Sequence, residues 1–404
     1  MNKTLYFLIL LLFLTNDLIA QQENTISLDG EWEIIFDDNN EGSSSGWMKP
    51  DVFEAHAARQ TVQVPGAWET YKKDYEGVAF YRKIFDLPAS WEGKVIRLQF
   101  GAVNYLAEVW LNDEVVGYHE GGFTPFEFRV DEMIRPGEQN ILTLRVVGPI
   151  ILSDKEIDGV RKLETPQWRG GITGGIWQSV NLMATGNAYI EDVFLEPKIS
   201  NNTVTFHMEV DHTAIKGVEA EVVMEVFEVG SDEKRIAGTA ENWILRPGIN
   251  KKVKELHLQD VDYWSPDNPQ LYRAVVRVVV DGRVSDTWQN NFGMRELTIR
   301  DKDFYLNGKR IYIKATFFEG LYPNGIAYPD SEEMARKEIR LAKEAGFNMI
   351  RPWRRPPAPM WLDLADEMGV LVVGSPALEC MQLPLSTPYL PSRVKNEITQ
   401  AVLR

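Results

Sequence analysis

The sequence predicts a multidomain protein: a β-sandwich of the jelly-roll type, an immunoglobulin-like β-sandwich, and the first three βα units of a (β/α)8 TIM barrel. The apolar pattern carries this prediction because it changes twice along the chain. Short alternating strands run from residue 26 to about 185, a second all-β stretch runs to 291, and strands then alternate with helices. A length of 404 residues leaves room for two or three domains. The expected domain ranges are 21–186, 187–297 and 298–404.

The first β stretch contains about 160 residues, which fits a jelly roll better than a seven-stranded immunoglobulin sandwich. The second has about a hundred residues and some seven strands, which suits an immunoglobulin-like module. Clear strands of the first stretch are 30–36, 80–85, 95–100, 107–111 and 140–147, with a turn at Asn112–Asp113, and those of the second are 203–210, 220–226 and 271–278.

After residue 291 apolar strands alternate with amphipathic helices, which is typical of a parallel sheet covered by helices. Asp330 and Glu333, three residues apart, predict a capping box, and the helix that they open is expected to end at Gly346. Doubly wound and barrel folds both fit, but no glycine-rich phosphate loop follows a strand, so a barrel is favoured. The expected elements are strands at 310–315, 347–351 and 370–373 and helices at 330–345, 359–368 and from 391.

Composition excludes several classes of function. The chain has 43 Lys and Arg against 59 Asp and Glu, a net charge of −16, so nucleic acids and anionic membrane surfaces are poor partners. A single cysteine, Cys380, excludes an internal disulfide. His207 and His212 lie five apart in a predicted strand and point to opposite faces, so we do not expect them to chelate a metal. The sequence indicates no metal site and no cofactor, and it leaves a divalent or monovalent cation open.

The amino terminus has the order of a secretory signal. Lys3 precedes an apolar run over 5–14, and cleavage is expected after Ala20, so residues 1–20 form a predicted signal peptide. The run is short for a bilayer span, which disfavours the alternative of an uncleaved anchor. We therefore expect an exported protein without a membrane partner; the sequence does not indicate an oligomeric state.

Several motifs together resemble glycoside hydrolase family 2, which includes β-galactosidases, β-glucuronidases and β-mannosidases. The resemblance covers nearly the whole mature chain. It implies a carbohydrate substrate and hydrolysis of β-glycosides by a retaining two-carboxylate mechanism, and leaves the three sugars open. The matching segments are 27–32 (SLDGEW), 64–68 (VPGAW), 109–112 (VWLN), 117–126 (GYHEGGFTPF), 174–180 (GGIWQSV), 291–295 (NFGMR) and 304–309 (FYLNGK).

The resemblance places both catalytic carboxylates outside this chain. The family's acid/base is the Glu of an Asn-Glu pair ending the fourth barrel strand, and its nucleophile ends the seventh. Residues 298–404 number 107, whereas a barrel takes about 250. Both groups are therefore expected beyond Arg404, and Asn396–Glu397 is expected to be solvated helix surface.

Substrate-binding candidates come from the ends of the three predicted barrel strands, because barrel active sites form on that face. Arginine offers a fixed donor fork to a carboxylate or to hydroxyls, and tryptophan offers a flat apolar face to a pyranose ring. The alternative for each is structural, as an ion pair or as packing under a loop. The candidates are Glu319, Arg351, Trp353, Arg354 and Glu379, with Trp168 from a glycine-flanked loop.

The residues leave two classes of function open. One is an exported glycosidase, of which this chain is an incomplete piece. The other is a non-catalytic carbohydrate-binding or interaction protein built on the two β modules. Three βα units alone would expose an apolar strand edge, which favours the glycosidase.

Overall fold

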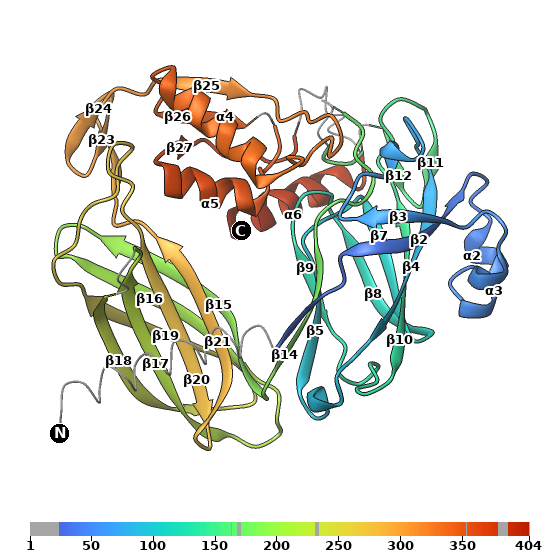
Figure 1. The fold of residues 1–404 in the computed structure, drawn as a ribbon, viewed down its shortest axis with the longest axis horizontal. Coiled ribbons are helices and arrows are strands. Elements are labelled where there is room, and N and C mark those ends of the chain that lie inside the picture. Colours follow the sequence, from blue (N-terminus) through green and yellow to red (C-terminus); the bar gives the residue numbers. More distant parts are fainter. Residues whose placement is uncertain are drawn as a thin grey trace.

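The structure is a computed structural model that describes residues 24–162, 164–167, 171–230, 234–352, 354–378 and 387–403. The predicted signal peptide and Cys380 lie outside the described residues. Two β domains stand side by side, and the carboxyl-terminal helices and strands, orange and red in Figure 1, lie across one end of both. Among the described residues, no helix combines the length and the apolar character that a membrane crossing requires.

The first domain is the predicted jelly-roll sandwich. Its six-stranded sheet has the order β3-β2-β4-β10-β7-β8, and a four-stranded sheet has the order β1-β14-β5-β9. Apolar side chains of both sheets, among them Trp32, Tyr81 and Leu98, are almost fully buried between them. The strands are β1 (Thr25–Ser27), β2 (Gly30–Asp37), β3 (Gln60–Val64), β4 (Val78–Asp86), β5 (Val95–Phe100), β7 (Leu106–Leu111), β8 (Glu114–Glu120), β9 (Phe126–Arg129), β10 (Gln139–Val147) and β14 (Val180–Thr185).

Several short elements lie outside the two main sheets of this sandwich. They are helices α2 (Gly42–Ser45) and α3 (Pro50–Ala55), 3-10 turns η1 (Trp68–Thr70) and η2 (Ala89–Trp91), and the paired strands β6 (Val103–Asn104) with β13 (Gly175–Ile176) and β11 (Glu156–Ile157) with β12 (Val160–Arg161). The turn predicted at Asn112–Asp113 joins β7 to β8 with φ angles of 52° and 71°. Asn and Asp tolerate this left-handed backbone, which two-residue hairpins need.

The second domain is the predicted immunoglobulin-like sandwich. A three-stranded sheet β15-β16-β19 packs on a four-stranded sheet β18-β17-β20-β21. His207 is partly exposed on β16 while His212 is buried, so the two do lie on opposite faces. The strands are β15 (Ala188–Lys198), β16 (Thr203–His212), β17 (Val218–Glu228), β18 (Arg235–Leu245), β19 (Gly248–His257), β20 (Tyr272–Val280) and β21 (Arg283–Phe292).

The third part contains the expected parallel sheet, β25-β26-β27. Helices α4 and α5 cover one face of it, where Ile339, Ile350 and Leu364 share a buried cluster. The elements are β22 (Leu297–Arg300), β23 (Asp303–Leu306), β24 (Lys309–Ile311), β25 (Ala315–Phe318), α4 (Glu332–Glu344), β26 (Met349–Pro352), α5 (Pro359–Met368), β27 (Leu371–Val372) and α6 (Leu390–Leu403).

Two boundaries in this part differ from the prediction. The prediction of one strand at 310–315 is wrong. Asn307 and Gly308 form a tight turn with φ angles of 52° and 75°, and this turn pairs β24 with β23 as an antiparallel hairpin. The first parallel strand begins only at Ala315. Helix α4 is capped by Ser331 and not by Asp330, since the Ser331 hydroxyl accepts the Met334 amide at 3.1 Å.

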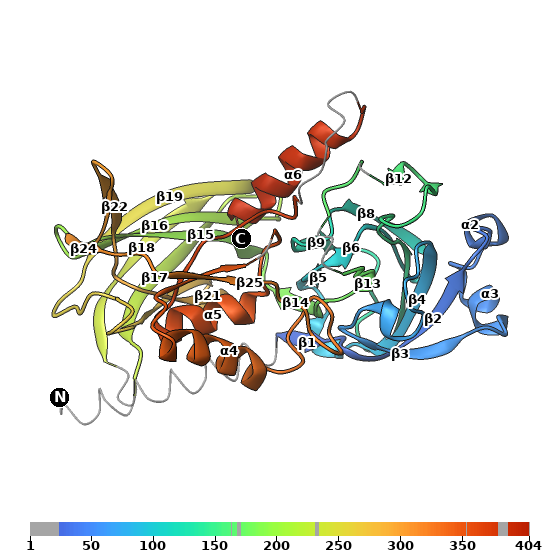
Figure 2. The ribbon, with the colours of Figure 1, turned by 90° about the horizontal axis from the view of Figure 1, so that it is seen from above.

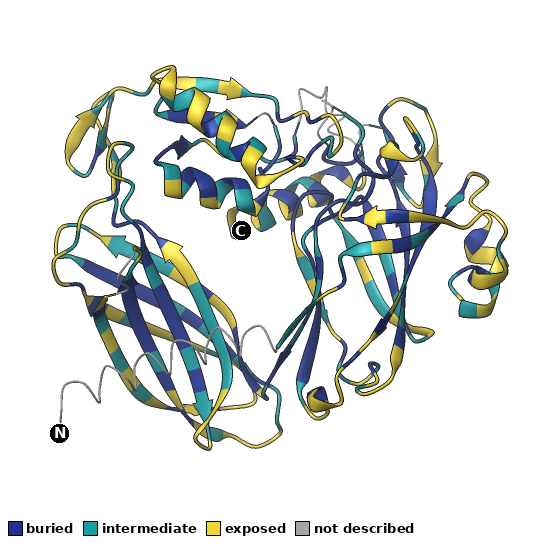
Figure 3. Ribbon diagram, viewed as in Figure 1, coloured by how far each residue is buried: buried dark blue, intermediate teal, exposed yellow. Residues whose placement is uncertain are grey.

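Figure 2 shows α6 lying apart from α4 and α5, and Figure 3 shows the buried interiors of the two sandwiches as dark blue bands.

The parallel sheet contacts the rest of the protein at both ends of its strands. At the amino-terminal edge, Met349 and Leu371 share a buried cluster with Trp264 of the immunoglobulin-like domain. The indole of Trp264 also donates to the Asp366 carbonyl of α5 at 2.8 Å. The immunoglobulin-like domain therefore packs against the amino-terminal ends of the parallel strands and against α5.

Candidate functional site

The carboxyl-terminal edge of the parallel sheet faces the jelly-roll domain. Ala327 follows β25 and Ala377 follows β27, and both share a buried cluster with Ala102, Phe123 and Trp177 of that domain. Side chains at this edge are where barrel enzymes place their active sites. The contact therefore brings the first domain alongside the candidate binding face.

Arg351 projects from the face of the sheet that α4 and α5 leave uncovered. Its neighbour Ile350 is buried against the helices, and successive side chains of a strand point to opposite faces. Arg351 is exposed, and it pairs in register with Phe317, whose side chain is 50% exposed. In a closed barrel this uncovered face is the interior, and Arg351 is the next-to-last residue of β26, so it lies at the carboxyl-terminal end of the strand, where the active sites of barrel enzymes form.

Glu319 and Arg354 stand at the same edge. Glu319 directly follows β25 and is partly exposed, and Arg354 follows β26 with a φ of 49°. A left-handed backbone at a non-glycine residue is uncommon and costs on the order of 1 kcal/mol or more, so the loop after β26 is held in an unfavourable conformation by its surroundings.

Arg355 has a structural role. Its side chain is buried and donates to the Gly320 carbonyl at 2.5 Å. Burial lowers the pKa of Arg355 to about 10, although Tyr322, Glu319 and Glu338 favour its charge. The cavity beside it measures only about 10 Å³. Arg355 is thus buried beside a very small space and binds the backbone at Gly320, which supports the loop after β25.

Three further substrate-binding candidates from the sequence lie outside the described residues, namely Trp168, Trp353 and Glu379. The described part of the candidate site therefore consists of Glu319, Arg351 and Arg354 at the strand ends.

An ion pair that the sequence analysis missed joins α6 to the jelly-roll domain. The Arg393 side chain, 5% exposed, donates to both carboxylate oxygens of Glu120, at 2.7 and 3.2 Å. It also donates to the carbonyls of Gly159 at 2.8 Å and Glu164 at 3.3 Å. The helical spacing of α6 could not indicate these contacts, because the residues that Arg393 binds lie more than 200 positions earlier in the sequence.

The expectation for Glu397 is wrong in one respect. Asn396 and Glu397 lie within α6, as predicted, but Glu397 is only 2% exposed and is not solvated helix surface. A Cβ placed on Gly121 would lie 3.7 Å from its carboxylate. The helix turns this residue toward the β8 end of the jelly roll, whereas Ile398 and Val402 are exposed.

The segment 119–122, which meets α6 through Glu120, is held in place by contacts within the jelly-roll domain. The Gly122 carbonyl accepts the indole N–H of Trp177 at 2.7 Å, and Gly121 donates its amide to the Tyr105 carbonyl at 3.1 Å. His119 stacks on Phe126 at 4.0 Å, and burial lowers the pKa of His119 to about 4. These contacts give the segment a structural role.

Several buried polar atoms at this junction have no hydrogen-bond partner among the described residues. They are His119 Nε2, Thr124 Oγ1, Glu164 Oε2, Thr165 Oγ1 and Thr173 Oγ1. Buried polar atoms are normally satisfied, so these five atoms are exceptions to the usual pairing in this part of the jelly-roll domain. The same described residues contain no group of three His, Cys, Asp or Glu side chains arranged to hold a metal.

Comparison with known proteins identifies the family. Three models of glycosyl hydrolases family 2 match in order: the sugar-binding domain at 25–186, the model that carries the family's name alone at 188–295, and the TIM barrel domain at 297–400. The chain belongs to glycosyl hydrolase family 2. The jelly roll is thus the family's sugar-binding domain, and the parallel sheet is the start of its barrel.

Relatives of the chain include proteins named β-galactosidase, from Thermoanaerobacter pseudethanolicus, and β-glucuronidase, from Streptococcus agalactiae. The first is 28% identical over 86% of this chain and 46% of its own length. The second is 27% identical over 88% of this chain and 57% of its own length. The chain therefore spans about half the length of these relatives.

Solved structures share the fold. A family 2 member from Bacteroides cellulosilyticus has a TM-score of 0.76 at 22% identity, covering 94% of this chain and 51% of that one. A β-glucuronidase from Ruminococcus gnavus, solved with D-glucuronic acid, has a TM-score of 0.78 at 21% identity and covers 94% and 64%. At such identities the likeness shows the arrangement of domains alone.

Proposed function

We propose that this chain is part of an exported glycosidase that hydrolyses the O-glycosidic bonds of β-glycosides. Family membership and the names of the two relatives support this activity. The observation that carries the proposal is the position of the sugar-binding domain. It packs against Ala327 and Ala377, which follow two of the barrel strands, so a glycan at the strand ends would meet both domains.

The proposed chemistry is that of a retaining glycosidase. One carboxylic acid protonates the leaving oxygen, and a carboxylate about 5 Å away forms a covalent glycosyl intermediate that water then hydrolyses. We place both groups beyond Arg404, since a barrel has eight strands and the parallel sheet described here has three. The residues of this chain would bind and orient the sugar, with Arg351 donating to its hydroxyl or carboxylate oxygens.

The test is an assay with aryl β-galactoside, β-glucuronide and β-mannoside. The 404-residue chain should hydrolyse none of them. A reading frame that continues past the codon for Arg404, through an apolar strand ending in Asn-Glu, should hydrolyse at least one. Turnover by the 404-residue chain that survives Glu397→Gln and Glu379→Gln would refute this assignment, as would an immediate stop codon in intact genomic DNA.

Export is the second part of the proposal. The basic residue, apolar run and small residue at Ala20 support a cleaved signal peptide. Amino-terminal sequencing of the protein from the culture medium or periplasm should give a start at Gln21. A product that keeps Met1 and stays in the cytoplasm would contradict export.

A further inference from the structure

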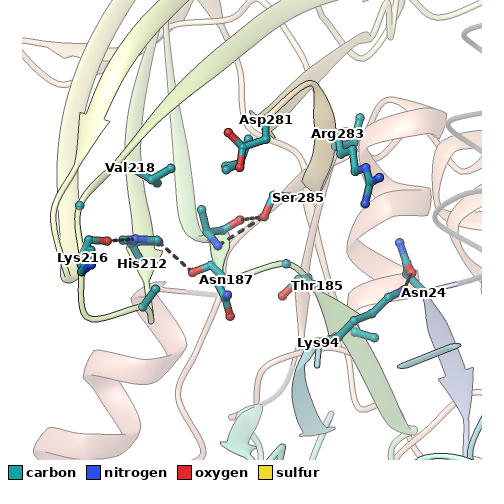
Figure 4. Close-up of a pocket in the computed structure, with 17 residues that line it drawn as sticks. Asn24, Lys94, Thr185, Asn187, His212, Lys216, Val218, Asp281, Arg283 and Ser285 are labelled. Carbon is teal, nitrogen blue, oxygen red and sulfur yellow. Dashed lines mark hydrogen bonds between the residues drawn. The ribbon is translucent and has the colours of Figure 1, made fainter. Parts of the chain in front are cut away.

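A cavity of about 580 Å³ lies where the two β-sandwiches meet (Figure 4). Asn24, Lys94 and Thr185 line it from the sugar-binding domain. The turn between β16 and β17 and the turn between β20 and β21 line it from the immunoglobulin-like domain. Its volume falls within the range of about 300–1,000 Å³ that is usual for ligand pockets.

The walls of this interdomain cavity are fixed in place. The amide of Gly186, in the linker between the domains, donates to the Ser285 carbonyl at 2.7 Å, and a Cβ on Gly186 would collide with the Ser285 side chain. On the other wall, the imidazole of His212 contacts the carbonyl oxygens of Lys216 at 2.8 Å and Asn187 at 3.2 Å. Both walls of the cavity are therefore held by hydrogen bonds within the protein.

The charge at the cavity is opposite to that of the whole protein. Lys94, Lys216 and Arg283 line it, with Asp281 as the acidic lining residue, in a chain whose net charge is −16. The side chains of Lys216 and Arg283 form no ion pair with any of the described residues. Figure 4 shows Lys94 and Arg283 on opposite sides of the domain junction. Lys216 and Arg283, which have no ion-pair partner within the described ranges, together with Lys94, whose ammonium donates to Asn24 at 2.6 Å, favour an anionic ligand in the cavity.

A buried hydroxyl gives independent support. Thr185 lines the cavity and is only 4% exposed, yet its Oγ1 has no hydrogen-bond partner among the residues described. A buried hydroxyl without a partner is unfavourable, and a bound molecule that reached this hydroxyl from the cavity would satisfy it. The cavity therefore combines positive charge with a neutral polar group, which suits a ligand that carries both an anion and hydroxyls.

We propose that the interdomain cavity binds an anionic sugar unit, a hexuronate or a sulfated hexose. Its acidic group would contact Arg283 and Lys94, while Thr185 and Asp281 would bind sugar hydroxyls. The inference rests on the proposed function in one respect, namely that the protein acts on glycans. It adds a binding site that holds an acidic unit of the glycan at the junction of the two β domains.

Isothermal titration calorimetry of the 404-residue chain at low ionic strength tests the site. The probes are D-glucuronate, glucose 6-sulfate, glucose and inorganic sulfate. At least one anionic sugar should bind about tenfold or more tightly than glucose and than sulfate, because it alone offers both kinds of contact. Equal binding of glucose would overturn the role of charge, and equal binding of inorganic sulfate would overturn the assignment to a sugar.

Variants locate the binding. Arg283→Ala should weaken binding of the anionic sugar by about tenfold, the effect of losing one charge-assisted hydrogen bond. Thr185→Val keeps the shape and should weaken it less. Lys198→Ala, at the exposed end of β15, is the matched loss of a cation outside the cavity and should leave binding unchanged. Normal binding by Arg283→Ala would refute the site.

Binding and turnover are measured separately, so the two proposals can fail separately. Hydrolysis by the longer protein without binding in the cavity would refute the anionic-sugar site alone. Binding that depends on Arg283 in a protein that hydrolyses no glycoside would refute the proposed glycosidase activity alone.

Discussion

The ion pair between Arg393 and Glu120 should decide whether α6 stays in place. Among the described residues, α6 shares no hydrophobic cluster with the parallel sheet, so its attachment depends on contacts with the sugar-binding domain. Removing one partner of a buried ion pair costs about 3–5 kcal/mol. Because the Glu120 side chain is 31% exposed and can be rehydrated, we expect Arg393→Ala to cost about 2 kcal/mol.

The assay is hydrogen exchange of the α6 amides, which reports the free energy of local opening. A loss of about 2 kcal/mol corresponds to exchange about 30-fold faster. Arg336→Ala is the matched control, since Arg336 also binds two carboxylates, Glu332 at 2.7 Å and Glu367 at 2.9 Å, but its side chain is 39% exposed. It should cost less than about 1 kcal/mol. Unchanged α6 exchange in Arg393→Ala, or an equal effect on α6 in the control, would refute the reasoning.

Two further predictions concern stability, measured by urea unfolding. Burial raises the pKa of Glu69 to about 7 from its ordinary 4.5, against the hydrogen bonds from the Gly174 amide. The stability that this group contributes is therefore present below pH 4.5 and is lost as pH rises through 7. In Glu69→Gln, the change in the free energy of unfolding between pH 4.5 and pH values above 7 should be smaller by about 2 kcal/mol than in the wild type. Parallel plots of the free energy of unfolding against pH for the two proteins would contradict this. Gly320 has a φ of 69°, and a Cβ there would lie 2.6 Å from Arg355, so Gly320→Ala should cost more than Gly308→Ala, whose φ is 75° with open space around it. We expect about 1 kcal/mol for Gly308→Ala and about 2 or more for Gly320→Ala; equal losses would show that the Arg355 contact is unimportant.

The sequence predicts the fold well where local patterns decide it. Alternation located most long strands of the two sandwiches, because one face of each strand is buried. Alternation gave a wrong prediction at 310–315, where Ile311 and Ile313 alternate with other residues as in a strand. The tight turn at Asn307–Gly308, just before this stretch, pairs β24 with β23, and residues 312–314 connect β24 to β25. The left-handed backbone of this turn, and not the apolar alternation, therefore decides the structure there.

The candidate site was predictable only in part. The rule that barrel sites form at strand ends located Glu319, Arg351 and Arg354 near one edge, because it depends on chain order alone. It could not show that Arg355 is buried beneath its loop. Nor could it show that Arg393 pairs with Glu120, 273 positions away in the sequence. Contacts between domains depend on how the domains dock, and no local pattern encodes that.

The stereochemistry of the reaction tests the central claim most directly. A longer reading frame that contains the Asn-Glu strand should be incubated with the aryl β-glycoside that it cleaves, and the product followed by proton NMR from the first minutes. We predict that the β-anomer of the free sugar appears first and then mutarotates, as a covalent intermediate requires. First appearance of the α-anomer, or no hydrolysis of any β-glycoside in the panel, would contradict a retaining β-glycosidase.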